Sequence, residues 1–291
     1  MDNPNLTLHL INKLKIITKS LPLVDAHRHS LYDLEVIRGL DGVPVENWTN
    51  LAEFVLYQKK SKSLFQNDLF YAVKDWLNFS LDEGVKTILD FSAKHAREDL
   101  NSIYSEHSIK SFSPLKWSDI SNIDNLKLKP DYVILPDEKG LSVQLIEDMV
   151  SFSSNFPNIK FTMHCLESVE KRLLAENKFG GSTIEWLYNN NFLNERLLLV
   201  HVNEISEKDV ELIRDTKVRI VLCPLMRKPL QYNSPKIPLD IPMYFGTDAP
   251  LISGSRSIYD VAVKQIIDWI NHGVDVELAI NSAFKALTRN L

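Results

Sequence analysis

Four side chains that could bind one cation follow short apolar runs at widely separated places in the chain. His27 and His29 follow LVDA, His164 follows IKFTM, and Asp248 ends the run MYFGTD. The spacing of two places the imidazoles of His27 and His29 on the same face of an extended strand. Imidazole nitrogens with a carboxylate suit zinc or another first-row transition metal. An HxH pair alone also occurs in ordinary loops, so the prediction of a metal site depends on the whole set.

Two further residues have types that could act on a substrate beside such a metal. Glu167 lies three residues after His164 and, without being a ligand, is well placed to shuttle protons. A glutamate favoured by a helix N-terminus explains the same position equally well. His201 follows LLLV, and we expect it to orient or polarise the water on the metal, with a buried structural histidine as the alternative. We expect Asp248 to accept the proton of that water as well as to bind the metal.

The elements that must position these residues alternate along the chain. Apolar periodicity close to 3.6 predicts an N-terminal helix and helices within Val143–Phe152, Ile184–Tyr188, Val210–Ile213 and Ser257–Ile270. Ser206 with Asp209 three residues later resembles a capping box. The predicted strands are eight short runs rich in apolar and β-branched residues: Leu23–Ala26, Val85–Leu89, Ser108–Ser111, Tyr132–Leu135, Ile159–Met163, Leu197–Val200, Val218–Leu222 and Met243–Phe245.

Strands that alternate with helices predict parallel pairing through right-handed crossovers. Eight such units predict an α/β fold of the (β/α)8 TIM barrel type, which forms one domain over residues 1–291. A doubly wound open sheet is the main alternative. A barrel gathers the carboxyl ends of all its strands at one face, which is where every candidate residue falls, and we therefore favour the barrel.

Bulk properties exclude several classes of function. The net charge of the 291 residues is -5 with no basic stripe, so no nucleic-acid polymer is expected as a partner. No apolar run approaches the roughly 20 residues of a membrane span, and two cysteines make no disulfide framework, which favours the cytoplasm. Neither a GxSxG elbow nor a phosphate loop is present. The expected partner is a small-molecule substrate, and a homo-oligomer is left open.

Taken in order, these motifs resemble the amidohydrolase superfamily, and within it the adenosine deaminase, cytosine deaminase and chlorohydrolase-like enzymes. The resemblance implies a (β/α)8 fold with one divalent metal, zinc or alternatively iron, and here without a sizeable flanking β-sandwich. It implies that His27, His29, His164 and Asp248 match the metal ligands, that Glu167 matches the proton shuttle, and that His201 matches the histidine beside the hydrolytic water. The stretches that carry it are VDAHRH (24–29), LDEGVKTILDF (81–91), FTMHCLES (161–168), LLLVHVNEISEKDVELI (197–213) with VRIVLCP (218–224), and MYFGTDAP (243–250).

The resemblance also implies a reaction in which water, activated as metal-bound hydroxide, adds to a C=N carbon of a nucleobase- or nucleoside-like heterocycle and ammonia leaves. Departures leave the substrate open: Leu225-Met226 stand where relatives have Ser-Asn, and Ala249 replaces a second aspartate. A hydrolase of another C–N, lactone or C–halide bond, or a non-catalytic metal-binding barrel, are the alternatives. Arg227 could bind an anionic group of the substrate, but we favour a surface position for its side chain. The residues expected to contact the substrate are Arg28, Phe91, Trp117, Cys223 and Arg227.

Overall fold

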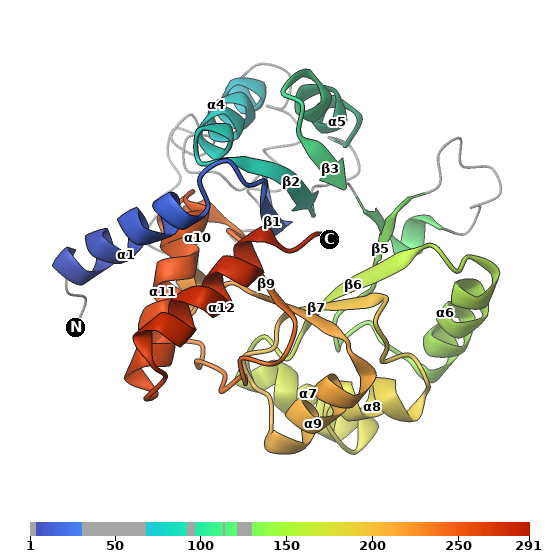
Figure 1. Ribbon diagram of the computed structural model, residues 1–291. Coiled ribbons are helices and arrows are strands. Elements are labelled where there is room, and N and C mark those ends of the chain that lie inside the picture. The colour runs from blue at the N-terminus through green and yellow to red at the C-terminus, as the bar shows by residue number, and fades with distance from the viewer. Residues whose placement is uncertain (1–3, 31–67, 92–96, 113, 121–129) are drawn as a thin grey trace, which may run out of the picture. The chain divides into compact units, whose positions relative to one another are not determined.

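The computed structural model describes residues 4–30, 68–91, 97–112, 114–120 and 130–291, which form helices and parallel strands (Figure 1). They belong to two compact units, and we describe each by itself. Unit 1 comprises Met1–Ser113, Cys223–Gln231 and Phe245–Leu291, and unit 2 comprises Pro114–Leu222 and Tyr232–Tyr244. The organisation of residues 1–291 as one domain stays a prediction.

Unit 1 contains a parallel sheet with the strand order β1 (Leu23–Arg28), β2 (Val85–Asp90) and β3 (Lys110–Phe112). All six residues of β1 are buried, as expected for a parallel strand covered on both faces. Helix α4 packs on β2, α5 on β3 and α12 on β1, and α1 packs on α11 and α12. The helices of this unit are α1 (Pro4–Ile17), α4 (Asp68–Asp82), α5 (Arg97–Glu106), α10 (Pro250–Ser253), α11 (Ile258–Asn271) and α12 (Val276–Thr288), with the 3-10 turn η5 (Pro224–Met226).

Unit 2 contains a second sheet, in which the strands follow one another in sequence order from β4 to β9. Every pairing from β4 to β8 is parallel. Its strands are β4 (Leu115–Lys116), β5 (Tyr132–Ile134), β6 (Lys160–Cys165), β7 (Leu197–His201), β8 (Arg219–Leu222) and β9 (Met243–Phe245), the last of which passes into unit 1 after Tyr244. Its helices are α6 (Val143–Asn155), α7 (Val169–Phe179), α8 (Thr183–Asn189) and α9 (Glu207–Thr216), with the 3-10 turn η3 (Trp117–Asp119).

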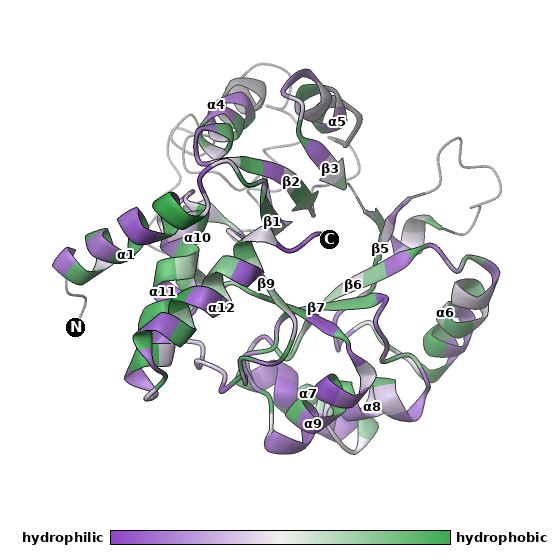
Figure 2. Cartoon of the chain, viewed as in Figure 1, coloured by the Kyte–Doolittle hydropathy of each residue, from purple (hydrophilic) through white to green (hydrophobic). Residues whose placement is uncertain are grey.

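The helices form where the sequence alternates apolar and polar residues at helical spacing. Helix α11 buries nine of its residues, whereas α7 buries only Ala175, and Figure 2 shows the same contrast in hydropathy. Helix α9 begins with the predicted capping box, because Ser206 and Asp209 each accept a hydrogen bond from the backbone N–H of the other. The predicted helices are therefore confirmed, together with their parallel α/β setting.

The sheets differ from the prediction in two places. Ser108 has a φ of 54°, a left-handed conformation that interrupts extended backbone, and β3 begins at Lys110. The two-residue strand β4 was not predicted, because two residues carry no periodicity. Among the residues that the structure describes, the strands form two sheets, and closure of eight strands into one barrel is not observed.

A half-buried carboxylate that binds the start of α11 makes the stability of unit 1 depend on pH. Glu83 accepts hydrogen bonds from Ser257 Oγ at 2.5 Å and from the backbone N–H of Ile258 at 2.9 Å. Burial raises the pKa of Glu83 from 4.5 to about 7, because those hydrogen bonds only partly offset the lost hydration. Between these two values the native state keeps a proton that the unfolded chain has lost, so the free energy of unfolding falls as the pH rises.

We expect the urea midpoint of unfolding to decrease between about pH 5 and about pH 7.5, and to decrease less in Glu83→Gln. The exposed Glu211 in α9 provides a matched control, Glu211→Gln, which should follow the wild-type curve. Parallel pH dependence in the wild type and in Glu83→Gln would show that Glu83 titrates normally.

Candidate functional site

Unit 1 brings together three of the four predicted metal ligands. His27 lies in β1 and His29 directly after it, and the Nε2 atom of each imidazole is 3.8 Å from Asp248 Oδ1. The two rings meet edge to face, with their centroids 4.8 Å apart. Backbone bonds fix this arrangement, since Asp248 N–H donates to the carbonyl of His27, and His29 N–H donates to the carbonyl of Asp248, each at 2.9 Å. We call these three residues the unit 1 cluster.

The residues around Asp248 explain why the sequence reads GTD at this point. A Cβ atom on Gly246 would lie 2.7 Å from His27 Cβ and 2.8 Å from the His27 carbonyl oxygen, so only glycine lets the segment approach β1. Thr247 donates its N–H (3.0 Å) and its hydroxyl (2.6 Å) to Asp25, a fully buried carboxylate in β1. Burial raises the pKa of Asp25, although Arg28 and Thr247 act in the opposite direction.

Replacing Gly246 with alanine is expected to lower the free energy of unfolding by about 1–3 kcal/mol, because the methyl group overlaps the backbone of His27. Urea unfolding measures this loss. Gly181→Ala is the matched control, since the atom nearest to its added methyl belongs to the flexible Glu185 side chain. Equal midpoints for the two variants would contradict the close approach of residue 246 to β1.

Unit 2 holds the other candidate residues, and we call His164, Glu167 and His201 the unit 2 cluster. His164 lies in β6, His201 ends β7, and their rings stack with centroids 5.2 Å apart. His201 Nε2 is 3.7 Å from Glu167 Oε1. Burial lowers the pKa of His164 despite the opposing charge of Glu167, which favours a neutral imidazole with a lone pair to donate.

The pKa of Glu167 responds to two opposing influences. Burial raises it, but the nearby His201 and His164 and a hydrogen bond from the Tyr232 side chain lower it, and the net pKa lies below its ordinary value. Glu167 is therefore an ionised carboxylate beside a histidine at neutral pH. Such a group can accept and return protons next to a reacting atom.

Two candidate residues, His201 and Asp248, and two residues adjacent to candidate residues adopt a backbone conformation that is unfavourable for side chains other than glycine. The φ angles are 48° at Leu166, 74° at His201, 45° at Val202 and 59° at Asp248. Such conformations persist only where surrounding contacts enforce them, and they cluster at functional sites. In unit 2 these contacts include the bond from Val202 N–H to the Cys165 carbonyl at 3.0 Å.

Arg28, which the sequence predicts as a substrate contact, lies in the core of unit 1. Its side chain is 1% exposed, donates to Asp25 and Ser80, and stacks on Trp76 with its guanidinium carbon 3.9 Å from the ring centroid. These contacts hold the guanidinium inside unit 1, and its contact with a substrate stays a prediction. Phe91, by contrast, packs edge-on against His27 with the ring centroids 4.3 Å apart, beside the unit 1 cluster.

The other three residues that the sequence predicts as substrate contacts lie in different parts of the two units. Trp117 is half-buried and meets the ring of Phe152 edge-on in unit 2. Cys223 is buried in unit 1. Arg227 is only 4% exposed and donates to Gln265 and Asp268, so the favoured surface position is wrong.

Three residues beside these clusters were not identified from the sequence. Asp25 carried a signal, because a carboxylate next to the apolar start of a predicted strand needs a buried partner. Asn203 donates from Nδ2 to the Glu167 carbonyl at 3.0 Å, and Tyr232 binds the Glu167 side chain. Both lie in irregular segments, where no periodicity marks a residue as important.

Comparisons with known proteins extend this description. No family model matches the chain. A 5-methylthioadenosine/S-adenosylhomocysteine deaminase of Pyrococcus horikoshii is 30% identical over 103 residues, which are 33% of this chain and 24% of that protein. The deaminase of the same name from Pyrococcus abyssi is 22% identical over 72% of this chain and 52% of its own length. The chain thus spans about a quarter and about half of these relatives.

Solved structures share the fold over most of the chain. An adenosine deaminase from Xanthomonas campestris with bound zinc matches with a TM-score of 0.72 at 14% identity, covering 91% of this chain and 64% of that one. A guanine deaminase from C. acetobutylicum with bound guanine matches with a TM-score of 0.67 at 16% identity, over 92% and 74%. The chain shares the fold of these deaminases. The zinc complex of an atrazine chlorohydrolase from Arthrobacter aurescens shares this fold, with a TM-score of 0.64 at 13% identity over 87% and 64%.

This shared fold confirms the predicted α/β class. It also accounts for the pattern of candidate residues, since His27, His164, His201 and Asp248 all lie at or just after the carboxyl ends of strands. Within the described part of the chain, no helix has the length and apolar character needed to cross a bilayer.

Proposed function

We propose that this chain is a metal-dependent hydrolase that deaminates a nucleobase- or nucleoside-like nitrogen heterocycle. The observation that carries the proposal is the unit 1 cluster, in which two imidazoles approach one carboxylate oxygen at 3.8 Å. The names of the relatives and of two structural neighbours, all deaminases, support the reaction class.

The donor set fits a transition metal. Ligand bonds of about 2.0–2.1 Å in a tetrahedral site separate neighbouring donor atoms by about 3–4 Å, and the cluster has this spacing. We propose one divalent ion, zinc in first place and iron as the alternative, with His27, His29, Asp248 and His164 of unit 2 as its ligands. A metal bound there lowers the pKa of a water ligand toward about 7 and so supplies a nucleophile at neutral pH.

The protein's own residues move the protons. Asp248 accepts a proton from the attacking water, and His201 orients that water through its ring nitrogen. Glu167, ionised at rest, takes one proton of that water and gives it to the ring nitrogen of the substrate while the water oxygen adds to the adjacent carbon. The proton that Asp248 accepts is the second one of the water, and it passes through Glu167 to the amino group. The C–N bond then breaks, and ammonia leaves with the oxygen of the water in its place on the ring.

The test combines metal analysis with a substrate panel. Protein purified without chelators should contain one equivalent of zinc or iron, and it should release ammonia from at least one aminated purine, pyrimidine or nucleoside. Methylthioadenosine, S-adenosylhomocysteine, adenosine and guanine belong in the panel because they are named for the relatives and neighbours. Metal-replete protein that releases no ammonia from any member would refute the deaminase proposal.

A specific observation also favours a second candidate, hydrolysis of a C–halide or other bond. The atrazine chlorohydrolase shares the fold, and Leu225, Met226 and Ala249 occupy positions where the deaminase-like pattern has polar residues. Chloride release from chlorinated triazines, without ammonia release from the panel, would favour this candidate over the first. Inertness to both panels in metal-replete protein would favour a non-catalytic metal-binding role.

The remaining proposals concern the cellular compartment, the binding partner and the oligomeric state of the protein. The two cysteines, Cys165 and Cys223, are buried and form no disulfide in the described residues, which supports a reducing compartment such as the cytoplasm. We propose a small-molecule substrate as the partner, without a nucleic-acid polymer or a membrane. Light scattering of the purified protein tests whether it forms a homo-oligomer.

A further inference from the structure

A closed ring of hydrogen bonds in unit 1 begins at the residue directly after His29. Ser30 N–H donates to Asp90 Oδ1 at 3.3 Å, and the hydroxyl of Tyr104, in α5, donates to Asp90 Oδ2. The hydroxyl oxygens of Ser30 and Tyr104 are 2.7 Å apart. Because the single proton of the phenol goes to Asp90, the Ser30 hydroxyl is the donor to Tyr104. We call Ser30, Asp90 and Tyr104 the Asp90 network.

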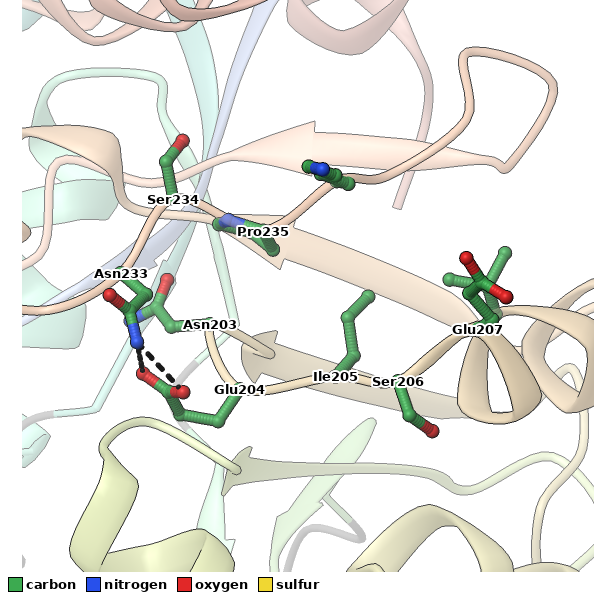
Figure 3. Close-up of a pocket in the computed structure, with 10 residues that line it drawn as sticks. Asn203, Glu204, Ile205, Ser206, Glu207, Asn233, Ser234 and Pro235 are labelled. Carbon is green, nitrogen blue, oxygen red and sulfur yellow. Dashed lines mark hydrogen bonds between the residues drawn. The ribbon is translucent and has the colours of Figure 1, made fainter.

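The Asp90 network is buried, since Ser30 and Tyr104 are fully enclosed and Asp90 is 1% exposed. A carboxylate without water depends on its protein partners, so its hydrogen bonds are costly to break and favour one arrangement. The contact in unit 2 that Figure 3 shows is different. Asn233 donates from Nδ2 to both carboxylate oxygens of Glu204, at 2.8 and 3.0 Å, but at an exposed position where water can replace either partner.

The Asp90 network holds the backbone on one side of His29, and Asp248 holds it on the other. His29 N–H donates to the carbonyl of Asp248 at 2.9 Å, and the next N–H along the chain, that of Ser30, is the one that Asp90 binds. Two consecutive peptide groups are thus anchored to two separate segments of unit 1. The direction in which the His29 side chain leaves the backbone is thereby fixed.

The residue after Asp90 restricts the imidazole rings themselves. Phe91 N–H donates to a carbonyl of β1 at 2.7 Å, which holds the end of β2 against the histidine pair. The centroid of its ring is 4.3 Å from that of His27 and 5.8 Å from that of His29. A fixed backbone and a packed ring together keep the Nε2 atom of His29 directed at Asp248.

We propose that Ser30, Asp90 and Tyr104 are positioning residues that hold His29 in the orientation in which it binds the metal, so that the Asp90 network sets the metal affinity of the unit 1 cluster. Removal of the groups that support a metal ligand typically weakens metal binding by about 10–100-fold. This inference rests on the proposed function, because it assumes that His29 is a ligand. It is tested by metal binding alone, without any substrate.

The first test measures the Kd for zinc of the full chain by competition with a coloured chelator. Tyr104→Phe removes one phenol of the Asp90 network, and we expect it to raise the Kd about tenfold. Tyr259→Phe is the matched control, because Tyr259 is a buried tyrosine of unit 1 whose hydroxyl is 2.8 Å from Thr18 Oγ1 and 3.3 Å from the carbonyl oxygen of Glu83. Both variants should unfold at lower urea concentration, but only Tyr104→Phe should bind zinc less tightly. An unchanged Kd in Tyr104→Phe, or an equal rise in both variants, would overturn the proposal.

Ser30→Ala is a second variant, and it decides the question if Tyr104→Phe does not fold. It removes a hydroxyl but keeps the N–H that Asp90 binds, so we expect the Kd for zinc to rise about threefold. The double variant should bind zinc about as tightly as Tyr104→Phe, because both changes act through the same network. Fully additive losses would show that the two hydroxyls act independently, against the proposal.

Cobalt(II) in place of zinc reports the geometry of the site. We expect the visible absorption bands of the cobalt protein to shift in Tyr104→Phe and to stay in place in Tyr259→Phe, a difference that a loss of stability does not produce. Unshifted bands in Tyr104→Phe would contradict a role in orienting His29. A wild type that binds zinc but releases no ammonia would refute the deaminase proposal alone, whereas a wild type that binds no zinc would refute both.

Discussion

Replacing His29 with alanine is expected to remove the metal and to lower turnover roughly a thousandfold or more. The side chain is 17% exposed, so its loss disturbs packing less than the loss of the fully buried His27 would. A catalytic metal supplies several kcal/mol of transition-state stabilisation, and each 1.36 kcal/mol corresponds to a factor of ten in rate. Metal content by mass spectrometry and ammonia release measure the two effects.

The matched control for this experiment is His9→Ala, since His9 is an exposed histidine of α1. That variant should keep both its metal and its activity. Asp248→Asn should resemble His29→Ala, because it weakens the carboxylate that both imidazoles approach. Retention of a full equivalent of metal in both His29→Ala and Asp248→Asn would remove the basis of the proposed ligand set.

The second large effect is expected for Glu167→Gln, which should lower kcat by about 10²–10⁴-fold while the metal content stays at the wild-type value. The amide keeps the size of the side chain but cannot carry the proton. Steady-state kinetics with metal analysis of the same sample separates this result from loss of a ligand. Glu147→Gln, on the exposed face of α6, controls for the change of charge and should be fully active. Turnover near the native rate in Glu167→Gln would contradict the proposed role of Glu167 in proton transfer.

Sequence patterns predicted the elements well where burial dictates the residue types. The run Leu197–Val200 differs from β7 by one residue, and Met243–Phe245 matches β9, because parallel strands buried on both faces need continuous apolar residues. The histidines and Asp248 could be identified because they interrupt such runs at their carboxyl ends. The same reasoning identified α9 through its capping box.

Contacts between residues far apart in the chain could not be predicted in this way. Arg227 reads as a surface residue until its acceptors Gln265 and Asp268 are known, and these lie about 40 residues later. Arg28 is buried because Trp76 supplies a ring beneath its guanidinium, and nothing near Arg28 in the sequence indicates that ring. Tyr232 lies in an irregular segment, where a side-chain role depends entirely on tertiary contacts.

The hydrogen bonds between Asp25 and Thr247 span 222 residues of sequence, which sets a limit on when the unit 1 cluster can form during synthesis. At roughly 5–20 residues per second, a ribosome needs about 10 to 45 s to translate the intervening chain. Throughout that interval Asp25 in the nascent β1 lacks the N–H and the hydroxyl of Thr247, although β2 and Arg28 are already available to β1. A stop codon only slightly upstream of Gly246 would therefore leave the cluster unable to assemble.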